Sequence, residues 1–353
     1  MPTKQSAYDN VNCILYGWST IMTIYTETGC PNATYNFAFE DYCIDSLCKG
    51  NKILSIWQAD NTVMLGRYQI AQNEINDSKQ SVIHPAIVRR STGGGTIYTD
   101  VGTLLFTAIM PVHDVATIDF SLICKPFVHA LQKLGLHASL SGRNDILIDG
   151  KKVSGNAQTV RNGYLCAHGS LLYHADLDTL SQILHPDKQK IESKAIKSIR
   201  FRVANLSDYM EHPPTIDVFK AMFKEALLSM EDNAQAYILT DIDRSRIVEI
   251  KERKYDSWEW TYGNAPTFNI EHSMRFPMGR LIARMNVNGG AINSIRLYGD
   301  FLGINDLSPL ESSLTGIRYD KPSLRTAISK IDTYPYLRGI ANEELIRCIL
   351  GIG

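Results

Sequence analysis

The sequence has no long hydrophobic run and no excess of charge of one sign. No apolar stretch approaches the roughly 20 residues that a membrane span needs, so we expect no membrane segment. The 353 residues include 36 basic and 37 acidic side chains, which leaves a net charge of −1. This balance gives no overall field for holding nucleic acid or an anionic membrane. We therefore expect partners that are neither.

The sequence also lacks paired cysteines and a targeting signal. Its seven cysteines are scattered and odd in number, and no C-x-x-C pair occurs. This pattern argues against a disulfide framework or a structural zinc site. The segment 1–20 has neither the charged-then-apolar order of a secretory signal nor the arginine content of a transit peptide. We expect reduced thiols and a cytoplasmic protein.

The length of the chain predicts two domains, at roughly 100–200 residues per domain. The residue pattern of the sequence changes after "SWEWTYGNAPTFN", which places the domain boundary near residue 266. Residues 1–265 mix short β-rich runs with helical patterns, without regular alternation, and therefore predict an α+β fold with a mixed sheet. For residues 266–353 the pattern predicts two strands that turn at 288–290, followed by two helices.

Three consecutive glycines follow two arginines in "RRSTGGGTIYTD", residues 89–100. Glycine lets the main chain approach a ligand closely, and successive N–H groups can converge on an anion. Arg89 and Arg90 add guanidinium groups suited to phosphate. The run matches neither a Walker loop nor a G-x-G-x-x-G pattern. Three glycines are also typical of a plain turn or bulge, but the arginines favour an anion site.

A second cluster of polar residues lies in "SGRNDILIDGKKVSGNAQ", residues 141–158. The Asp-Gly pair at 149–150 predicts a tight hairpin turn. Asn144 and Asp145 lie at the mouth of its first strand, and Asp145 could hold magnesium or a base amine. Lys151 and Lys152 follow the turn and point to opposite faces, but the pattern does not decide which lysine faces inward. A solvated hairpin edge is the plain alternative.

Two further segments stand out. The first is "HGSLL", residues 168–172, where a glycine within a strand indicates close approach by a ligand or by backbone. A lone histidine such as His168 is more typical of a hydrogen-bonded core residue than of a catalyst. The basic stretch 185–206 is typical of a solvated loop. Its functional interpretation is a lid over a polyanion.

Together, and in this order, these motifs resemble the lipoate–protein ligase family. The similarity also covers "YNFAFEDY", "QADNTVMLGRYQIAQNEIN", "KAIKSIRFRVANL" and "SWEWTYGNAP", and so spans most of the chain. The resemblance implies the α+β fold group shared with biotin–protein ligases and octanoyltransferases. It implies a large catalytic domain with mixed β-sheets and packed helices, and a small α+β C-terminal accessory domain.

The resemblance implies a reaction in two steps. Lipoate and MgATP form lipoyl-adenylate and pyrophosphate, and the lipoyl group then passes to a lysine of a lipoyl-carrier domain. Such carriers are the E2 subunits of 2-oxoacid dehydrogenases and the glycine-cleavage H protein. The cofactors are therefore ATP and Mg²⁺, with lipoate as substrate. We expect a monomer.

The resemblance also implies roles for individual residues. Lys152 falls on the catalytic lysine that touches both lipoate and phosphate, which decides between the two lysines of the hairpin. Asp145 is the candidate for a magnesium ligand, and the stretch 185–206 falls on an adenylate-binding loop. The ATP and adenylate contacts fall on Arg90, Gly95, Thr96, Ile97, Tyr98, Asn144, Asp145 and Lys152. The lipoate contacts fall on Arg90, Gly94, Gly95, Lys152 and His168.

These residue types suit the chemistry. A carboxylate must attack a phosphate, both groups are anions, and a fixed cation between them offsets their repulsion. An apolar channel is needed for the acyl chain, and Val88, Ile97 and Leu171 are candidates for its walls. One alternative is an ATP-independent octanoyl or lipoyl transferase with a cysteine nucleophile, for which Cys166 is the only cysteine near the motifs. Another is a sensor that binds lipoate without turnover.

Overall fold

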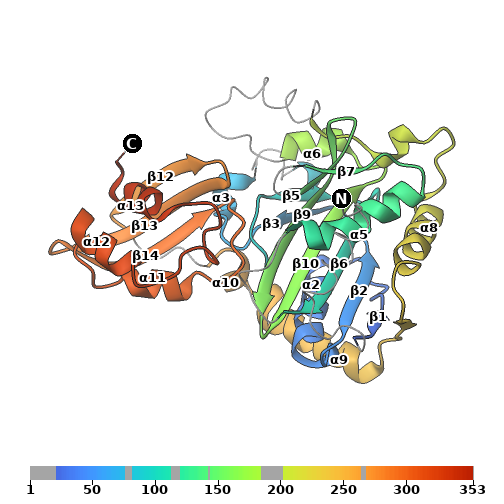
Figure 1. The fold of residues 1–353 in the computed structure, drawn as a ribbon, viewed down its shortest axis with the longest axis horizontal. Helices are drawn as coiled ribbons and strands as arrows, with labels where there is room; N and C mark the ends of the chain where they lie inside the picture. The colour runs from blue at the N-terminus through green and yellow to red at the C-terminus, as the bar shows by residue number, and fades with distance from the viewer. Residues whose placement is uncertain are drawn as a thin grey trace, which may run out of the picture.

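The computed structural model describes residues 21–75, 82–112, 120–141, 144–183, 202–263 and 268–352. These residues form a large strand-rich lobe and a smaller lobe beside it, built from the C-terminal strands and helices (Figure 1). Within the described ranges, no helix has the length and apolar character needed to cross a membrane.

An eight-stranded sheet forms the centre of the large lobe, in the order β11-β1-β2-β6-β10-β9-β8-β7. Strand β1 is parallel to both of its neighbours, and the other pairs are antiparallel, so the sheet is mixed as predicted. The strands are β1 (Thr23–Tyr25), β2 (Lys52–Trp57), β6 (Thr103–Pro111), β7 (Ser139–Ser141), β8 (Asp145–Ile148), β9 (Lys151–Arg161), β10 (Tyr164–Leu172) and β11 (Ala234–Ala236).

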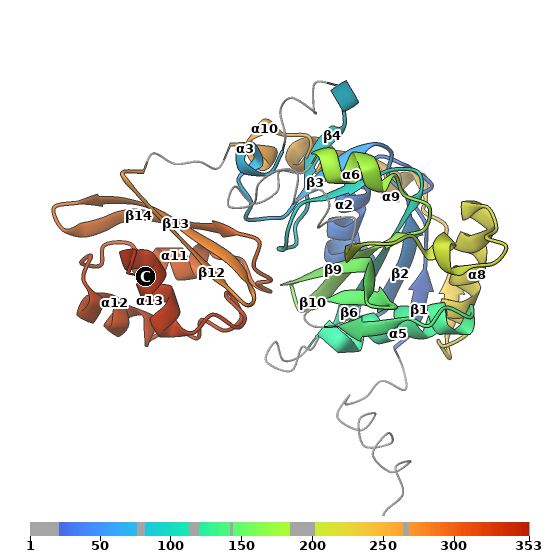
Figure 2. The ribbon, with the colours of Figure 1, turned by 90° about the horizontal axis from the view of Figure 1, so that it is seen from above.

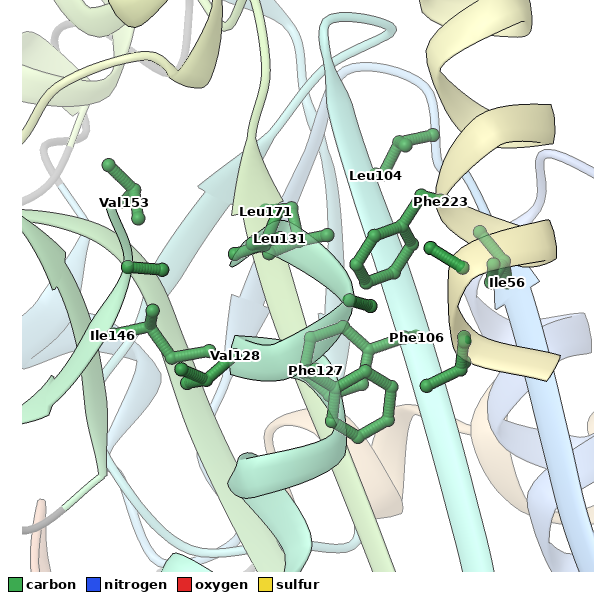
Figure 3. Close-up of a cluster of buried hydrophobic side chains, with 14 of the residues drawn as sticks. Ile56, Leu104, Phe106, Phe127, Val128, Leu131, Ile146, Val153, Leu171 and Phe223 are labelled. Carbon is green, nitrogen blue, oxygen red and sulfur yellow. The ribbon is translucent and has the colours of Figure 1, made fainter. Parts of the chain in front are cut away.

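Helices cover both faces of this sheet because side chains alternate along each strand. On one face, α5 (Phe120–Lys133) and α8 (Ile216–Leu228) pack on Phe106, whose ring stacks on Phe127 at 3.7 Å between centroids (Figure 3). On the other face, α2 (Ala33–Tyr42) and α9 (Asp241–Ile250) pack against alternate residues such as Leu105 and Cys166 (Figure 2). The sheet therefore separates two apolar cores.

A second sheet carries the glycine run. Its strands β3 (Thr62–Leu65), β4 (Ala86–Arg89) and β5 (Ile97–Thr99) lie in the order β4-β3-β5, with β3 parallel to β4 and antiparallel to β5. Because β4 and β5 flank β3, the run between them must cross the end of β3. Strands therefore flank the glycine run on both sides.

The Asp-Gly hairpin is also confirmed. Asp149 and Gly150 join β8 to β9 with φ angles of 49° and 75°, the pair of positive angles that a tight primed turn requires. The pairing of β8 with β9 has one irregularity, between Ile146 and Leu147. The shorter elements of the large lobe are η2 (Cys43–Leu47), α3 (Ala71–Glu74), α6 (Leu177–Ile183), η4 (Leu206–Tyr209), η5 (Lys251–Tyr255) and α10 (Trp258–Thr261).

The small lobe has a three-stranded antiparallel sheet with helices packed on one face (Figure 2). Its elements are β12 (Ile270–Phe276), β13 (Gly279–Asn288), β14 (Ala291–Gly299), α11 (Ser308–Leu314), α12 (Lys321–Ile328) and α13 (Asn342–Leu350). The predicted hairpin at 288–290 is present. The prediction of two strands and two helices was wrong, because β12 precedes the hairpin and the short helix α11 precedes the two longer ones.

The loop after β14 joins the two lobes. The carbonyl of Phe301 accepts a hydrogen bond from the Gly94 N–H at 3.1 Å, and the carbonyl of Ile304 accepts one from the Val160 N–H at 2.9 Å. The ring of Tyr68 stacks on Phe301 with 5.4 Å between centroids. The small lobe is thus packed directly on the glycine run.

Candidate active site

A cavity of about 140 Å³ opens where the glycine run meets β9 and β10. Eight of the ten residues predicted for the site line it, although they come from three separate parts of the chain. They are Arg90, Gly94, Gly95, Thr96, Ile97, Asn144, Lys152 and His168. Of the two that do not, Asp145 contacts a lining residue and Tyr98 lies on the far side of its strand.

The floor of the cavity is apolar. Besides Ile97, its apolar lining residues are Phe37, Trp57, Met64, Leu105 and Ala157. The predictions for Val88 and Leu171 were wrong: Val88 is buried among the residues under α2, and Leu171 belongs to the core on the opposite face of the main sheet (Figure 3). Alternation along β10 explains the second error, since Leu171 follows the cavity-lining Ser170.

Lys152 is the lysine of the hairpin that faces the cavity. Its Nζ lies 2.8 Å from Asp145 Oδ1, and the two side chains are 37% and 34% exposed. Lys151 is exposed and does not line this cavity. Gly155 leaves room for the amine, because a Cβ at that position would lie 2.8 Å from Lys152 Nζ. The amine is held beside a carboxylate yet stays open to a ligand.

Arg90 lines the cavity, but its guanidinium is hydrogen-bonded to main-chain carbonyls. Its guanidinium donates to the carbonyls of Met64, Gly93 and Gly95 at 2.9, 3.0 and 2.6 Å. Burial, together with the nearby Arg89, lowers the pKa of Arg90 to about 10. Arg90 therefore shapes the glycine run from beneath.

Arg89 lies outside the cavity altogether. Its guanidinium donates to five main-chain carbonyls, those of Gly66, Arg67, Gln69, Trp260 and Thr261. Burial lowers the pKa of Arg89 to about 10. The phosphate-binding role expected of this arginine was wrong, because its side chain ties β4 to the loop after β3 and to α10 and does not line the cavity.

The glycine run presents its main chain to the cavity, and Gly94 is the member with a left-handed conformation, at φ 90°. Its N–H is bonded to Phe301, so an anion would compete with that carbonyl. After the run, Thr96 donates through its hydroxyl to Gln69 Oε1 at 2.7 Å. The Tyr98 ring packs with Val63 on the far side, so only its main chain can face a nucleotide.

His168 is a hydrogen-bonded histidine at the cavity wall. Its Nδ1 lies 3.1 Å from Glu40 Oε1, and its Nε2 lies 2.7 Å from Thr92 Oγ1. Glu40, Phe37 and Trp57 were not among the site residues predicted from the sequence. The signal for Glu40 was an acid within the apolar helical stretch "YNFAFEDY", since a buried carboxylate needs partners.

Two further expectations concern cysteine and metal. Cys166 is 1% exposed, burial raises its thiol pKa well above the usual range, and it does not line the cavity. It is therefore unsuited to act as a thiolate nucleophile. The described ranges contain no group of three or more His, Cys, Asp or Glu side chains placed to hold a metal. Most of the basic stretch 185–206 lies outside the described residues.

The fold and the cavity define a class: a protein of mixed sheets and helices whose cavity combines apolar side chains, a glycine run and one partly exposed lysine. A family model, the lipoyl protein ligase A/B catalytic domain, matches residues 32–228, and a second, the bacterial lipoate protein ligase C-terminus, matches residues 265–349. The chain belongs to the lipoate–protein ligase family. The resemblance seen in the sequence is therefore confirmed.

Relatives along the whole chain agree. The chain is 38% identical to a lipoate–protein ligase of Streptococcus pyogenes, covering 87% of this chain and 92% of the relative. It is 34% identical to lipoate–protein ligase LplJ of Bacillus subtilis, covering 89% and 96%.

Solved structures share the fold. Plasmodium falciparum LipL1, determined with lipoate, aligns with a TM-score of 0.77 at 21% identity, over 93% of this chain and 99% of that one. A lipoate–protein ligase A bound with ATP aligns at 0.58 and 27% identity, over 69% and 99%. A bipartite ligase of Thermoplasma acidophilum, studied with its E2 lipoyl domain, aligns at 0.61 and 27%, over 71% and 99%. The predicted fold class is confirmed.

Proposed function

We propose that this chain activates lipoate with ATP and transfers the lipoyl group to a lysine of lipoyl-carrier domains, and that the cavity beneath the glycine run is where both steps occur. One observation carries the assignment to the cavity. Lys152 lines the same cavity as apolar side chains suited to the dithiolane and alkyl chain and as a main-chain run suited to phosphate.

In the first step, Lys152 offsets the repulsion between two anions. The lipoate carboxylate attacks the α-phosphate of ATP, pyrophosphate leaves, and lipoyl-adenylate forms. An ammonium that touches both groups stabilises the charge that builds up on the phosphate during transfer. The main-chain atoms of Gly95, Thr96 and Ile97 hold the nucleotide beside it, and Asn144 also lines the cavity.

In the second step, the amine of the acceptor lysine attacks the acyl carbon and AMP leaves. Lys152 remains next to the acyl carbonyl and polarises it. No nucleophile from the chain is needed, because the adenylate is already an activated acyl group. This agrees with the burial of Cys166.

The residues at the cavity fit a magnesium ion carried in with ATP. Mg²⁺ is commonly bound by one or two carboxylates, the phosphates of the nucleotide and water. Asp145, which contacts the cavity-lining Lys152, would supply one carboxylate. When bound, the ion neutralises charge on the phosphates, while Asp145 also orients the Lys152 amine through their ion pair.

The remaining assignments are proposals as well. We assign catalysis to residues 1–265 and an accessory role to residues 266–353, whose strands and helices enclose a core of their own. The acceptors are lipoyl domains of E2 subunits and the H protein, and the enzyme acts as a monomer in the cytoplasm. Light scattering of the purified chain tests the monomer directly.

The decisive experiment varies the nucleotide. The pure protein is incubated with lipoate and an apo lipoyl domain, with ATP and without it, and pyrophosphate and the mass of the acceptor are measured. We expect both pyrophosphate release and a lipoyl mass gain, and we expect both to vanish without ATP. Transfer from an acyl carrier without ATP, or binding without turnover, would overturn the proposal. Replacing the lipoyl domain by apo H protein tests the second acceptor.

A further inference from the structure

A chain of buried polar side chains runs underneath the cavity. It begins at Glu40 on α2, passes through His168 on β10 and Thr92 in the glycine loop, and ends at Arg90. The successive distances are 3.1, 2.7 and 3.1 Å. None of the four residues is more than 8% exposed. Three distant parts of the sequence are thereby joined.

The donors and acceptors along this chain agree in direction. An ionised Glu40 can only accept, so His168 Nδ1–H donates to it. When the ring carries this single proton, Nε2 accepts from the Thr92 hydroxyl, whose oxygen in turn accepts from Arg90 Nε–H. This arrangement assigns the Nδ1–H tautomer to His168.

Glu40 has a second branch that also ends at the cavity. Its Oε1 accepts from the hydroxyl of Thr107 at 2.7 Å, and that oxygen accepts from the indole N–H of Trp57 at 3.1 Å. Trp57 and His168 both line the cavity. One buried carboxylate thus orients two side chains of the wall.

The other end of the chain determines the shape of the glycine run. Arg90 donates to the carbonyls of Gly93 and Gly95, on either side of the left-handed Gly94. Because Arg90 is buried, its charge needs a compensating partner, and Glu40 is the acid whose charge acts on it. The buried acid and the buried base therefore support each other across the cavity floor.

We infer that Glu40 and Thr92 are positioning residues of the lipoate site, acting through His168 and Arg90 to hold the cavity wall and the glycine run in a shape ready for substrate. This inference rests on the proposed assignment of the cavity. Because the cavity wall is already ordered in the folded protein, the binding of lipoate does not have to order it, and the affinity for lipoate is higher. Loss of these hydrogen bonds should therefore weaken the binding of lipoate more than it slows the chemistry at Lys152.

The test uses Thr92, because valine keeps its shape and serine keeps its hydroxyl. Thr92→Val leaves His168 Nε2 and Arg90 Nε without their shared partner, and we expect the KM for lipoate to rise about tenfold. The kcat at saturation should fall less than about threefold, since Lys152 is untouched. Thr92→Ser should restore KM to within about twofold of the original protein.

Two measurements separate positioning from stability alone. Thr333→Val, in the small lobe, removes another buried threonine hydroxyl, which is bonded to Asn342, and should leave the KM for lipoate unchanged. The ring nitrogens of His168, observed by ¹⁵N NMR, should show the Nδ1–H tautomer in the original protein and lose that preference in Glu40→Leu, which removes the acceptor for Nδ1–H. An unchanged tautomer in this variant would overturn the inference.

The kinetic outcomes are equally decisive. A Thr92→Val protein whose KM for lipoate stays within twofold of the original, or a Thr92→Ser protein that behaves like Thr92→Val, would overturn the inference. If Lys152→Ala retains activity in the same assay, it is the assignment of the cavity that fails. The two failures are therefore distinguishable.

Discussion

The two sides of the cavity use positive charge in different ways. On the side of the glycine run, Arg89 and Arg90 are 8% and 4% exposed, and main-chain carbonyls take up most of their donors. On the side of the hairpin, Lys152 is 37% exposed and pairs with a carboxylate that is also partly open. Basic residues beside a glycine run are thus not automatically ligands. Burial can convert them into supports for the loop.

The largest expected effect is on catalysis and concerns Lys152, on the hairpin side of the cavity. Lys152→Ala removes the cation between the reacting anions, and we expect kcat for adenylation to fall by about 100- to 1,000-fold. Pyrophosphate release at saturating lipoate and ATP measures it. The matched control is Lys151→Ala, which removes the neighbouring, exposed lysine and should leave kcat within about twofold. Equal losses in the two variants would contradict the assignment of Lys152.

The next largest effect concerns Arg89, next to the glycine run. Arg89→Lys keeps the charge but cannot reach five carbonyls, so several buried acceptors lose their donor. We expect the free energy of unfolding to fall by about 3 kcal/mol, measured by urea denaturation. Arg318→Lys, at an arginine whose side chain is 82% exposed, is the control and should change stability by less than about 0.5 kcal/mol. A stable Arg89→Lys protein would show that the carbonyls find other partners.

A smaller effect tests how the lysine is placed. In Gly155→Ala the new methyl group would lie 2.8 Å from Lys152 Nζ, so the flexible amine must move. We expect kcat to fall by about 10- to 100-fold. In the Lys152→Ala background the same change should have no further effect, because the displaced group is absent. Additive losses would mean that Gly155 matters for another reason.

Asp145 should contribute less. Both members of its ion pair with Lys152 are about one-third exposed, and such pairs contribute about 0.5–1 kcal/mol. We expect Asp145→Asn to reduce kcat by about threefold to fivefold in excess Mg²⁺. A much larger loss that added Mg²⁺ relieves would indicate that Asp145 acts mainly on the metal.

The smallest expected effect concerns the thiol. Cys166→Ala removes a buried sulfur that does not line the cavity, so ATP-dependent turnover should stay within about twofold. The intact native protein should also resist alkylation at Cys166, as mass spectrometry can show. Loss of all transfer in this variant, with the fold retained, would revive the cysteine-dependent transferase.

Local patterns were sufficient to predict several elements of the fold. The Asp149–Gly150 pair specified the β8–β9 hairpin, and the turn at 288–290 specified the hairpin of the small lobe. Leu171 was misassigned because alternation shows that two faces exist without showing which core each face meets. Val88 lies in the same apolar cluster as the cavity floor but does not line the cavity. Glu40 was missed because its partner His168 lies 128 positions away.

The sequence by itself determined the order of the motifs, the hairpin turn and the presence of a flexible glycine run, since these depend on backbone preferences of neighbouring residues. Only the tertiary structure decided what each charge does. Charge is consumed or left available according to burial and to the carbonyls within reach, and those are contributed by segments far apart in the chain. The buried guanidinium of Arg90 binds carbonyls of the glycine run, while the amine of Lys152 remains available at the cavity.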